Sequence, residues 1–282
     1  MTLSNVIAHG DVLDVLTKTP DNTFDAGVTS PPYNKGKNRT GVLVSDIDYS
    51  DIDDSLEEGE YQDMQIAVLN ELFRVMKKGG SLFYNHKLRW DDKVMTHPMQ
   101  WLSKTKWAIK QEIVWDRNIA ANIRGWRFWQ VDERIYWLYK PRNEGDAGDE
   151  LLSKHALLSS VWQIRPENHK ETVSNHPAPF PIDIPLRCIY SLFDSAQKKL
   201  IIDPYMGSGT TAVACKMLGH DFYGIDISRT YIEQAYARTN NISEREVTDY
   251  LKEISLHTVK NPYNKRKARW DDGLQYYGGE WI

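Results

Sequence analysis

The sequence feature that most constrains the fold is an apolar segment that stops at two consecutive prolines. Phe24 to Thr29 is predicted to form a buried β-strand, and Ser30-Pro31-Pro32-Tyr33 follows it directly. A proline has no backbone N–H to donate to a neighbouring strand, so neither proline can continue a sheet. We therefore expect residues 30–33 at the carboxyl end of this strand, in a rigid and extended backbone.

Strand and helix patterns alternate along the rest of the chain. Further strands are expected over 5–9, 81–86, 111–115, 134–139, 199–203 and 221–226. Helices are expected over 11–18, 61–78, 95–105, 185–193, 210–218 and 230–239, the second of them ending at Gly79-Gly80. This order predicts an α/β fold, in which a Rossmann-like sheet has helices on both faces.

Composition places the chain among globular proteins. Its 282 residues are 41% hydrophobic and 11% aromatic, which is enough to bury a full core. No segment approaches the roughly 18 consecutive apolar residues of a membrane span, and the N-terminus lacks the pattern of a signal peptide. We expect a cytoplasmic protein without membrane contact or a metal site, in which Cys188 and Cys215 are buried thiols.

The charge balance limits how the chain can bind nucleic acid. Lys and Arg number 35 against 39 Asp and Glu, a net charge of −4, so any such contact needs a local basic patch. Candidate patches are formed by Lys35, Lys37 and Arg39, and by Arg124 and Arg127. The second patch alternates with Trp126, Phe128 and Trp129, a mixture that suits phosphates and bases, although these aromatic residues could equally belong to the core.

A second strand end carries a glycine-rich turn. Residues 203–211, Asp-Pro-Tyr-Met-Gly-Ser-Gly-Thr-Thr, link an expected strand to an expected helix, where glycine lets the backbone approach a ligand closely. Asp226 ends the following strand, and its carboxylate can accept hydrogen bonds from both ribose hydroxyls of a nucleoside. The alternative is a purely structural turn, with Asp226 as a helix cap.

The glycine-rich turn lacks the motifs of phosphate-binding and dinucleotide-binding loops, which limits the nucleosides that it can bind. A phosphate-binding loop of the Walker type would need Gly-Lys-Ser/Thr, and a dinucleotide fold would usually keep a third glycine. Residues 203–211 contain neither pattern. A cofactor without phosphates fits better, and S-adenosylmethionine is the leading candidate.

The proline turn offers two rigidly directed acceptors, the hydroxyl of Ser30 and the carbonyl of Pro31. They suit an exocyclic amino group, because binding its hydrogens favours a pyramidal nitrogen and directs the lone pair at a sulfonium methyl. Serine is a poor base at neutral pH, so we expect orientation rather than prior deprotonation to drive transfer. Tyr33 could stack on the base; the alternative is a rigid turn with a buried tyrosine.

Together these motifs resemble the beta class of bacterial and phage DNA amino-methyltransferases. Thr29-Ser30-Pro31-Pro32-Tyr33 precedes residues 203–209, the order of catalytic and cofactor motifs in that class, and the likeness runs from about Asn5 to Asn240. It implies a circularly permuted methyltransferase domain over 1–240 with DNA-recognition loops at 34–60 and 116–175. Residues 241–282 would be a C-terminal extension to which no role is assigned.

The resemblance also implies the residues of the site. The catalytic residues would be Ser30, Pro31, Pro32 and Tyr33. The residues that bind S-adenosylmethionine would be Asp11, Asn175, Phe180, Pro181, Asp203, Tyr205, Gly207, Ser208, Gly209, Thr210 and Asp226. Asp11 would contact the adenine of the cofactor, or serve only as a helix N-cap, and Phe180 would flank the cofactor, or belong to the core. DNA would be bound by Lys35, Lys37, Arg39, Arg124 and Arg127.

The implied activity is methylation of a base that is flipped out of double-stranded DNA. Ser is commoner at the first motif position among cytosine-N4 enzymes of this class and Asp is typical of adenine-N6 enzymes, so cytosine N4 is expected and adenine N6 is the alternative. Rival hypotheses are an enzyme acting on RNA or a protein glutamine, and an inactive DNA-binding relative. The resemblance also allows a homodimer and, without direct contact, a cognate restriction endonuclease in the same bacterial, archaeal or phage-infected cell.

Overall fold

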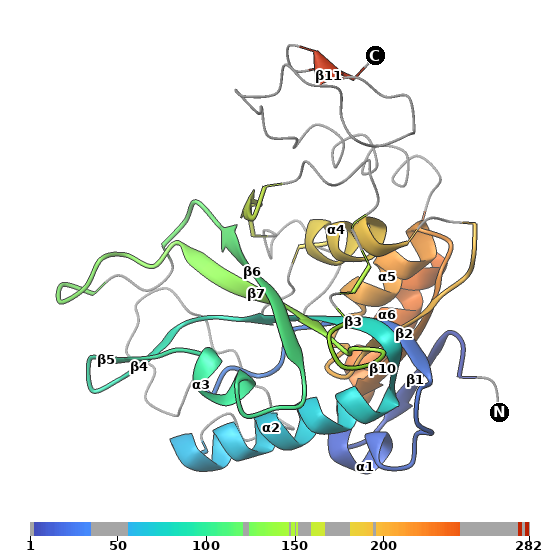
Figure 1. The fold of residues 1–282 in the computed structure, drawn as a ribbon, viewed down its shortest axis with the longest axis horizontal. Helices are drawn as coiled ribbons and strands as arrows, with labels where there is room; N and C mark the ends of the chain where they lie inside the picture. The colour runs from blue at the N-terminus through green and yellow to red at the C-terminus, as the bar shows by residue number, and fades with distance from the viewer. Residues whose placement is uncertain are drawn as a thin grey trace.

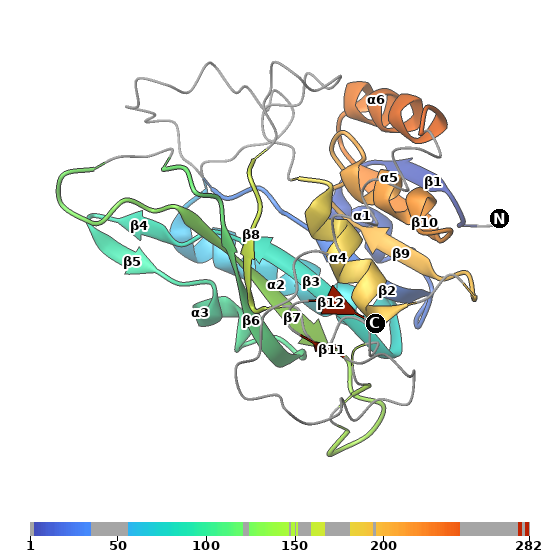
Figure 2. The same ribbon diagram turned by 90° about the horizontal axis from the view of Figure 1, so that it is seen from above.

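The computed structural model describes residues 3–34, 56–120, 124–146, 148–149, 151, 159–166, 181–193 and 196–242, together with the backbone of 276–277 and 280–281. Figure 1 shows the main sheet with its helices. Within the described residues the strand order of that sheet is β1-β10-β9-β2-β3-β7-β6-β8, with each strand labelled in Figure 2. Its strands are β1 (Val6–His9), β2 (Phe24–Thr29), β3 (Met76–His86), β6 (Ala108–Asp116), β7 (Asp132–Tyr139), β8 (Val161–Gln163), β9 (Leu200–Asp203) and β10 (Asp221–Asp226).

The sheet is parallel where the two sequence motifs meet. Strands β1, β10, β9, β2 and β3 run parallel to one another, whereas β7 is antiparallel to both β3 and β6. Ala26 of β2 lies opposite Ile201 of β9, so strands from distant parts of the chain are direct neighbours. Because parallel strands end at the same edge, the proline turn after β2 and the glycine-rich turn after β9 are adjacent.

Helices cover both faces of this sheet, as expected (Figure 2). One face carries α1 (Val12–Leu16), α2 (Glu58–Val75) and α3 (Met99–Leu102), and the other carries α4 (Asp183–Leu192), α5 (Thr210–Met217) and α6 (Arg229–Asn240). Successive side chains of a strand point to opposite faces. Leu82 and Tyr84 of β3 therefore pack in the cluster beside α2, while Phe83 between them packs in the cluster beside α4.

Of the helix expected over 95–105, only Met99–Leu102 is helical, so the prediction is wrong on both sides of that segment. Met95 and Thr96 belong instead to a hairpin of β4 (Arg89–Asp91) and β5 (Val94–Thr96). Met95 is 46% exposed, so the apolar spacing there does not mark a buried helix face. Helix α3 begins only after Pro98, because proline is tolerated at the start of a helix and not in its interior.

The predicted end of the second helix is also wrong. Helix α2 ends at Val75, and Lys77 to Gly80 belong to β3 instead of terminating the helix. The ammonium of Lys140 donates hydrogen bonds to the carbonyl oxygens of Arg74 (3.3 Å) and Met76 (2.6 Å). The cation that complements the negative end of α2 therefore comes from the far end of β7, a residue that local sequence could not identify.

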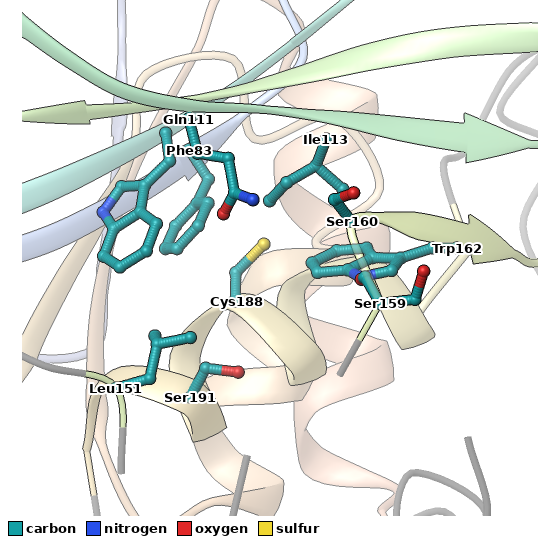
Figure 3. A pocket seen from close by; sticks show the side chains of 10 residues that line it. Phe83, Gln111, Ile113, Leu151, Ser159, Ser160, Trp162, Cys188 and Ser191 are labelled. Atoms are coloured by element: carbon teal, nitrogen blue, oxygen red, sulfur yellow. The ribbon is translucent and has the colours of Figure 1, made fainter. Parts of the chain in front are cut away.

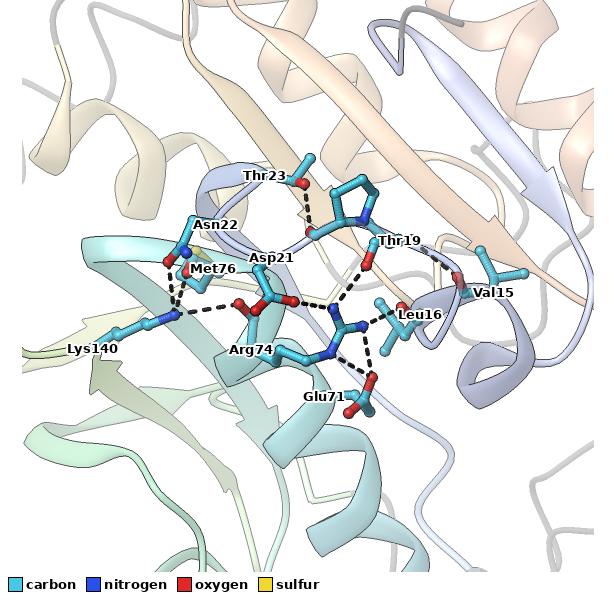
Figure 4. A network of polar contacts seen from close by, with 11 residues as sticks. Val15, Leu16, Thr19, Asp21, Asn22, Thr23, Glu71, Arg74, Met76 and Lys140 are labelled. Atoms are coloured by element: carbon cyan, nitrogen blue, oxygen red, sulfur yellow. Dashed lines mark hydrogen bonds and ion pairs between the residues drawn. The ribbon is translucent and has the colours of Figure 1, made fainter.

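Arg74 fixes the path of the chain from α1 into β2 (Figure 4). Its guanidinium donates to the carbonyl oxygens of Leu16 (2.6 Å) and Thr19 (2.8 Å) and forms an ion pair with Asp21 at 2.6 Å. A second ion pair joins Arg74 to Glu71, one turn earlier in α2, at 2.8 Å. This network holds the start of the strand that carries the proline turn.

Three further observations complete the fold. The edge strand β8 and a short antiparallel pair in the C-terminal extension, β11 (Tyr276–Tyr277) with β12 (Glu280–Trp281), were not expected from the sequence. Cys188 and Cys215 are buried free thiols, as predicted. None of the helices that the structure describes is long and apolar enough to cross a bilayer.

Candidate active site

The buried carboxylate of Asp203, at the end of β9, joins the two motif-bearing strand ends. It accepts hydrogen bonds from the hydroxyl of Thr29 at the end of β2 (2.8 Å) and from the hydroxyl of Thr211 in α5 (2.6 Å). The backbone N–H of Tyr205 donates to the same carboxylate at 3.1 Å. Burial raises the pKa of Asp203 to about 6, although these three donors act in the opposite direction.

Asp226 holds the glycine-rich turn from the other side. Its carboxylate accepts hydrogen bonds from the backbone N–H groups of Gly207 (2.7 Å) and Ser228 (2.8 Å). A carboxylate offers about four lone-pair positions, so these bonds are compatible with further donors from a ligand. The N-cap of α6 is Ser228, so the alternative role of Asp226 as a helix cap is wrong; its carboxylate instead holds the glycine-rich turn.

The turn itself depends on a glycine that packs against α6. Gly209 has a φ of +86°, and a Cβ at this position would lie 2.6 Å from the Cβ of Ala235. Arg238 of α6 donates to the carbonyl and hydroxyl oxygens of Ser208 (2.9 and 2.8 Å) and to the hydroxyl of Thr210 (3.2 Å). The side chains of Ser208 and Thr210 thus bind Arg238, a residue that the sequence analysis missed because a lone arginine in a helix carries no motif.

A cavity of about 260 Å³ opens at the ends of β1, β2, β9 and β10. Four of the residues predicted to form the site line it: Asp11, Pro32, Tyr205 and Asp226. Its remaining wall includes Tyr61, Met64 and Val68 of α2, which sequence reasoning also missed because their apolar spacing indicates only a buried helix face. The cavity therefore brings the proline turn and the nucleoside-binding candidates to one place.

Asp11 has a structural role at this cavity. It is the N-cap of α1, and its carboxylate accepts hydrogen bonds from the backbone N–H groups of Leu13 (2.8 Å) and Asp14 (3.2 Å). Asp11 also lines the cavity, because the chain turns there between the end of β1 and the start of α1. One residue can therefore cap the helix and face a ligand. A role in cofactor binding stays a prediction.

Ser30 and Tyr33 of the proline turn belong to a cluster of hydrogen-bonded polar side chains. The hydroxyls of Ser30 and Tyr33 are 2.7 Å apart, and the Tyr33 hydroxyl donates to the carboxylate of Glu133 at 3.1 Å. The amide nitrogen of Asn85 lies 2.6 Å from the Tyr33 oxygen and 3.2 Å from that carboxylate. Asn85 and Glu133 carry no motif, although the position of Asn85 at the end of β3, beside β2, is a signal that topology could have supplied.

The backbone of the proline turn is held from below by α2. The hydroxyl of Tyr61 donates to the carbonyl oxygen of Pro32 at 2.7 Å and lies 2.7 Å from Nε2 of His86. Burial lowers the pKa of His86 well below its usual range, which favours the neutral imidazole. The ring of Tyr33 packs against His86 with centroids 4.7 Å apart, so the orientation of this tyrosine is fixed by the protein.

Several predicted residues lie outside this arrangement. Asn175, Phe180, Lys35, Lys37 and Arg39 are not among the residues that the structure describes. Pro181 is buried at the start of α4, where its carbonyl accepts a hydrogen bond from Ile184, and the described wall of the cavity does not include it.

The aromatic residues next to Arg124 and Arg127 do not form core. Trp126, Phe128 and Trp129 are 42%, 98% and 61% exposed, so the core alternative is wrong for all three. The guanidinium of Arg127 lies 3.9 Å from the ring centre of Trp90 on the β4–β5 hairpin. Cationic and aromatic side chains thus share an exposed surface between β6 and β7.

A second cavity is a gap in the core. It measures about 40 Å³ and lies between α4 and the sheet, with the thiol of Cys188 directed into it (Figure 3). Phe83, Ile113 and Trp162 provide much of its wall. This volume has room for no more than a few water molecules. Burial also raises the pKa of the Cys188 thiol well above its usual range, which favours the protonated thiol.

Comparison with known proteins gives a family and a fold. A family model described as DNA methylase matches residues 24–237 of the chain. The DNA adenine methyltransferase YhdJ of Escherichia coli K12 is 26% identical over 298 aligned residues, covering 96% of this chain and 95% of YhdJ.

Two solved structures resemble the chain along most of its length. The cytosine-N4-specific PvuII DNA methyltransferase gives a TM-score of 0.65 at 19% identity, covering 90% of this chain and 93% of that one. TTHA0409 of Thermus thermophilus, complexed with S-adenosyl-L-methionine, gives a TM-score of 0.59 at 21% identity, covering 86% and 95%. The fold is therefore shared with both proteins.

The packing of Gly209 leads to a stability prediction with an internal control. Gly145 has nearly the same φ, +80°, but its added Cβ would meet nothing within 4 Å. Gly145→Ala should therefore lower the free energy of unfolding by only about 1 kcal/mol, the cost of a left-handed alanine. Gly209→Ala should cost at least about 3 kcal/mol because it also displaces Ala235. Urea unfolding measures both, and equal losses would contradict the tight contact between turn and helix.

Proposed function

Since the chain belongs to the DNA methylase family, we propose that it transfers a methyl group from S-adenosylmethionine to the exocyclic amino group of a flipped DNA base. The observation that carries the proposal is the cavity at the strand ends, where Pro32 of the proline turn and Asp226 of the nucleoside-binding candidates share one wall. The bond from Thr29 to Asp203 fixes the two turns relative to each other.

The described residues fit the cofactor. Two carboxylates, Asp11 and Asp226, and the ring of Tyr205 line a cavity whose other walls are largely apolar. Asp226 would accept hydrogen bonds from ribose hydroxyls, and the apolar wall from α2 would cover the adenine. When bound, S-adenosylmethionine supplies an electrophilic methyl group on a sulfonium. The complex of TTHA0409 with the same cofactor supports this assignment.

The proline turn would orient the amino group that receives the methyl. The hydroxyl of Ser30 and the carbonyl of Pro31 would accept its two hydrogens and so direct the nitrogen lone pair. Because the turn is held through Pro32 and Tyr33, these acceptors need no rearrangement when the base arrives. The contribution of Ser30 is therefore orientation and hydrogen bonding rather than removal of a proton.

The surface between β6 and β7 would contact double-stranded DNA. Arg124 and Arg127 suit phosphates, and the exposed rings of Trp126, Phe128 and Trp129 suit bases that are unstacked when a nucleotide is flipped. Flipping costs a few kcal/mol of stacking, which such rings can partly restore. An overall charge of −4 makes this local patch important for binding.

Cytosine N4 is the target that we favour. Ser30 occupies the motif position where serine is commoner among cytosine-N4 enzymes, and the PvuII neighbour is cytosine-N4-specific. Adenine N6 is the second candidate, because YhdJ, which matches nearly the full length of the chain, is a DNA adenine methyltransferase.

The activity can be tested with methyl-labelled S-adenosylmethionine. The protein is incubated with unmethylated duplex DNA of mixed sequence and, in separate reactions, with RNA and with ribosomal protein. Label should enter only the DNA, and digestion to nucleosides should yield N4-methylcytosine. Labelled N6-methyladenine would instead establish the second candidate, and unlabelled DNA would contradict the proposed function.

Substitutions in the proline turn should mainly lower the rate of methyl transfer, whereas substitutions among the nucleoside-binding candidates should mainly weaken cofactor binding. Ser30→Ala should lower the single-turnover rate of methyl transfer about 100-fold with little change in cofactor affinity, since it removes one orienting acceptor. Asp226→Ala should weaken cofactor binding about 10-fold or more, because a charged hydrogen-bond acceptor is lost. Asp14→Ala, at an exposed carboxylate of α1, is the control. Equal losses of rate and affinity in both site variants would refute this division.

A further inference from the structure

The hydrogen bonds at the proline turn lead to a carboxylate that the sequence motif does not contain. We propose that Glu133 sets the direction of these hydrogen bonds, so that Ser30 meets the target amino group as an acceptor. The inference rests on the proposed function and assigns Glu133 as a positioning residue of that site. Glu133 is the second residue of β7 and is only 7% exposed.

Every contact of the Glu133 carboxylate that the structure describes is with a donor. Arg117 donates to Oε1 at 3.1 Å, while the Tyr33 hydroxyl and the Asn85 amide donate to Oε2 at 3.1 and 3.2 Å. An ionised carboxylate has no proton to give, so each of these bonds can run only toward it. The ion pair with Arg117 balances its charge in this largely buried position.

The direction of these bonds determines what Tyr33 can offer Ser30. A phenol has one proton, and in this arrangement Tyr33 gives it to Glu133. The Tyr33 oxygen must then act as an acceptor toward Asn85 (2.6 Å) and toward Ser30 (2.7 Å). The hydroxyl proton of Ser30 is thereby directed at Tyr33. The Asn85 amide also donates to the Ser30 oxygen at 3.3 Å, and the second lone pair of Ser30 is presented to an incoming N–H group.

The same residues would behave differently without the charge. The amide of a glutamine at position 133 could donate to the Tyr33 oxygen, and Tyr33 could then turn its own proton toward Ser30. The Ser30 proton would then point at the target amino group. The Ser30 O–H and the amino N–H are both donors, so no hydrogen bond could form between them. A single change of Glu133 could thus invert the chain of hydrogen bonds while its atoms keep nearly the same positions.

The negative charge also has an electrostatic effect. As the amino nitrogen gains positive charge during transfer, its hydrogens become stronger donors to Ser30. Glu133, two hydrogen bonds further along the chain, stabilises that charge through the polarised hydroxyls of Tyr33 and Ser30. The methylated nitrogen releases its proton to solvent after transfer, so no proton has to travel along the chain, which agrees with serine being a poor base.

The inference is tested with three variants and a control. Glu133→Gln and Tyr33→Phe should each lower the single-turnover rate of DNA methylation about 10-fold or more. Their dissociation constants for S-adenosylmethionine and for DNA should stay within about twofold of wild type, because neither residue supplies a binding surface that the change removes. Combining both changes should cause no further loss, since both break one chain.

Glu112→Gln is the matched control. Glu112, on β6, also pairs with an arginine, Arg134, but its carboxylate is 37% exposed. This variant should methylate DNA at the wild-type rate. The inference is overturned if wild type methylates DNA and Glu133→Gln does so equally fast, or if the effects of Glu133→Gln and Tyr33→Phe multiply. DNA left unmethylated by the wild-type protein would overturn the proposed function, and this inference with it.

Discussion

The structure of the site depends on one buried carboxylate. Asp203 is fully buried, and such a group is costly unless donors surround it. Its donors come from three places: the end of β2 (Thr29), the start of α5 (Thr211) and the turn after β9 (Tyr205). Satisfying this carboxylate therefore requires that the proline turn and the glycine-rich turn occupy fixed positions beside each other. In the proposed function, these turns hold the base and the cofactor.

The parts of the fold that follow from local chemistry could be predicted from the sequence. Two prolines after an apolar strand can only end it, and the glycine-rich turn after β9 requires a residue, Gly209, that tolerates a positive φ and a close helix. The same reasoning failed for 95–105, where apolar spacing resembles a helix but Met95 is exposed on a hairpin. Periodicity records which residues are apolar and not whether a partner covers them.

The residues of the site that could not be predicted from the sequence were missed for a different reason. Glu133, Asn85 and Arg238 act through contacts between elements that are distant in sequence. Each is an ordinary residue of a strand or helix until the sheet order places β3 beside β2 and β7 beside β3, and until α6 packs against the glycine-rich turn. A motif identifies the groups that touch a ligand, whereas the groups that orient them become visible only in the folded chain.

The central claim is that Asp203 couples the two turns, and Thr29 provides the most direct measurement. Thr29 is the last residue of β2 and lies outside the described wall of the cavity, so Thr29→Val removes its bond to Asp203 without changing that wall. Calorimetric titration with S-adenosylmethionine should show binding weakened about 5-fold or more in Thr29→Val, the size of a typical coupling between sites, and unchanged in Thr29→Ser, which keeps the hydroxyl. Wild-type affinity in Thr29→Val would contradict the claim.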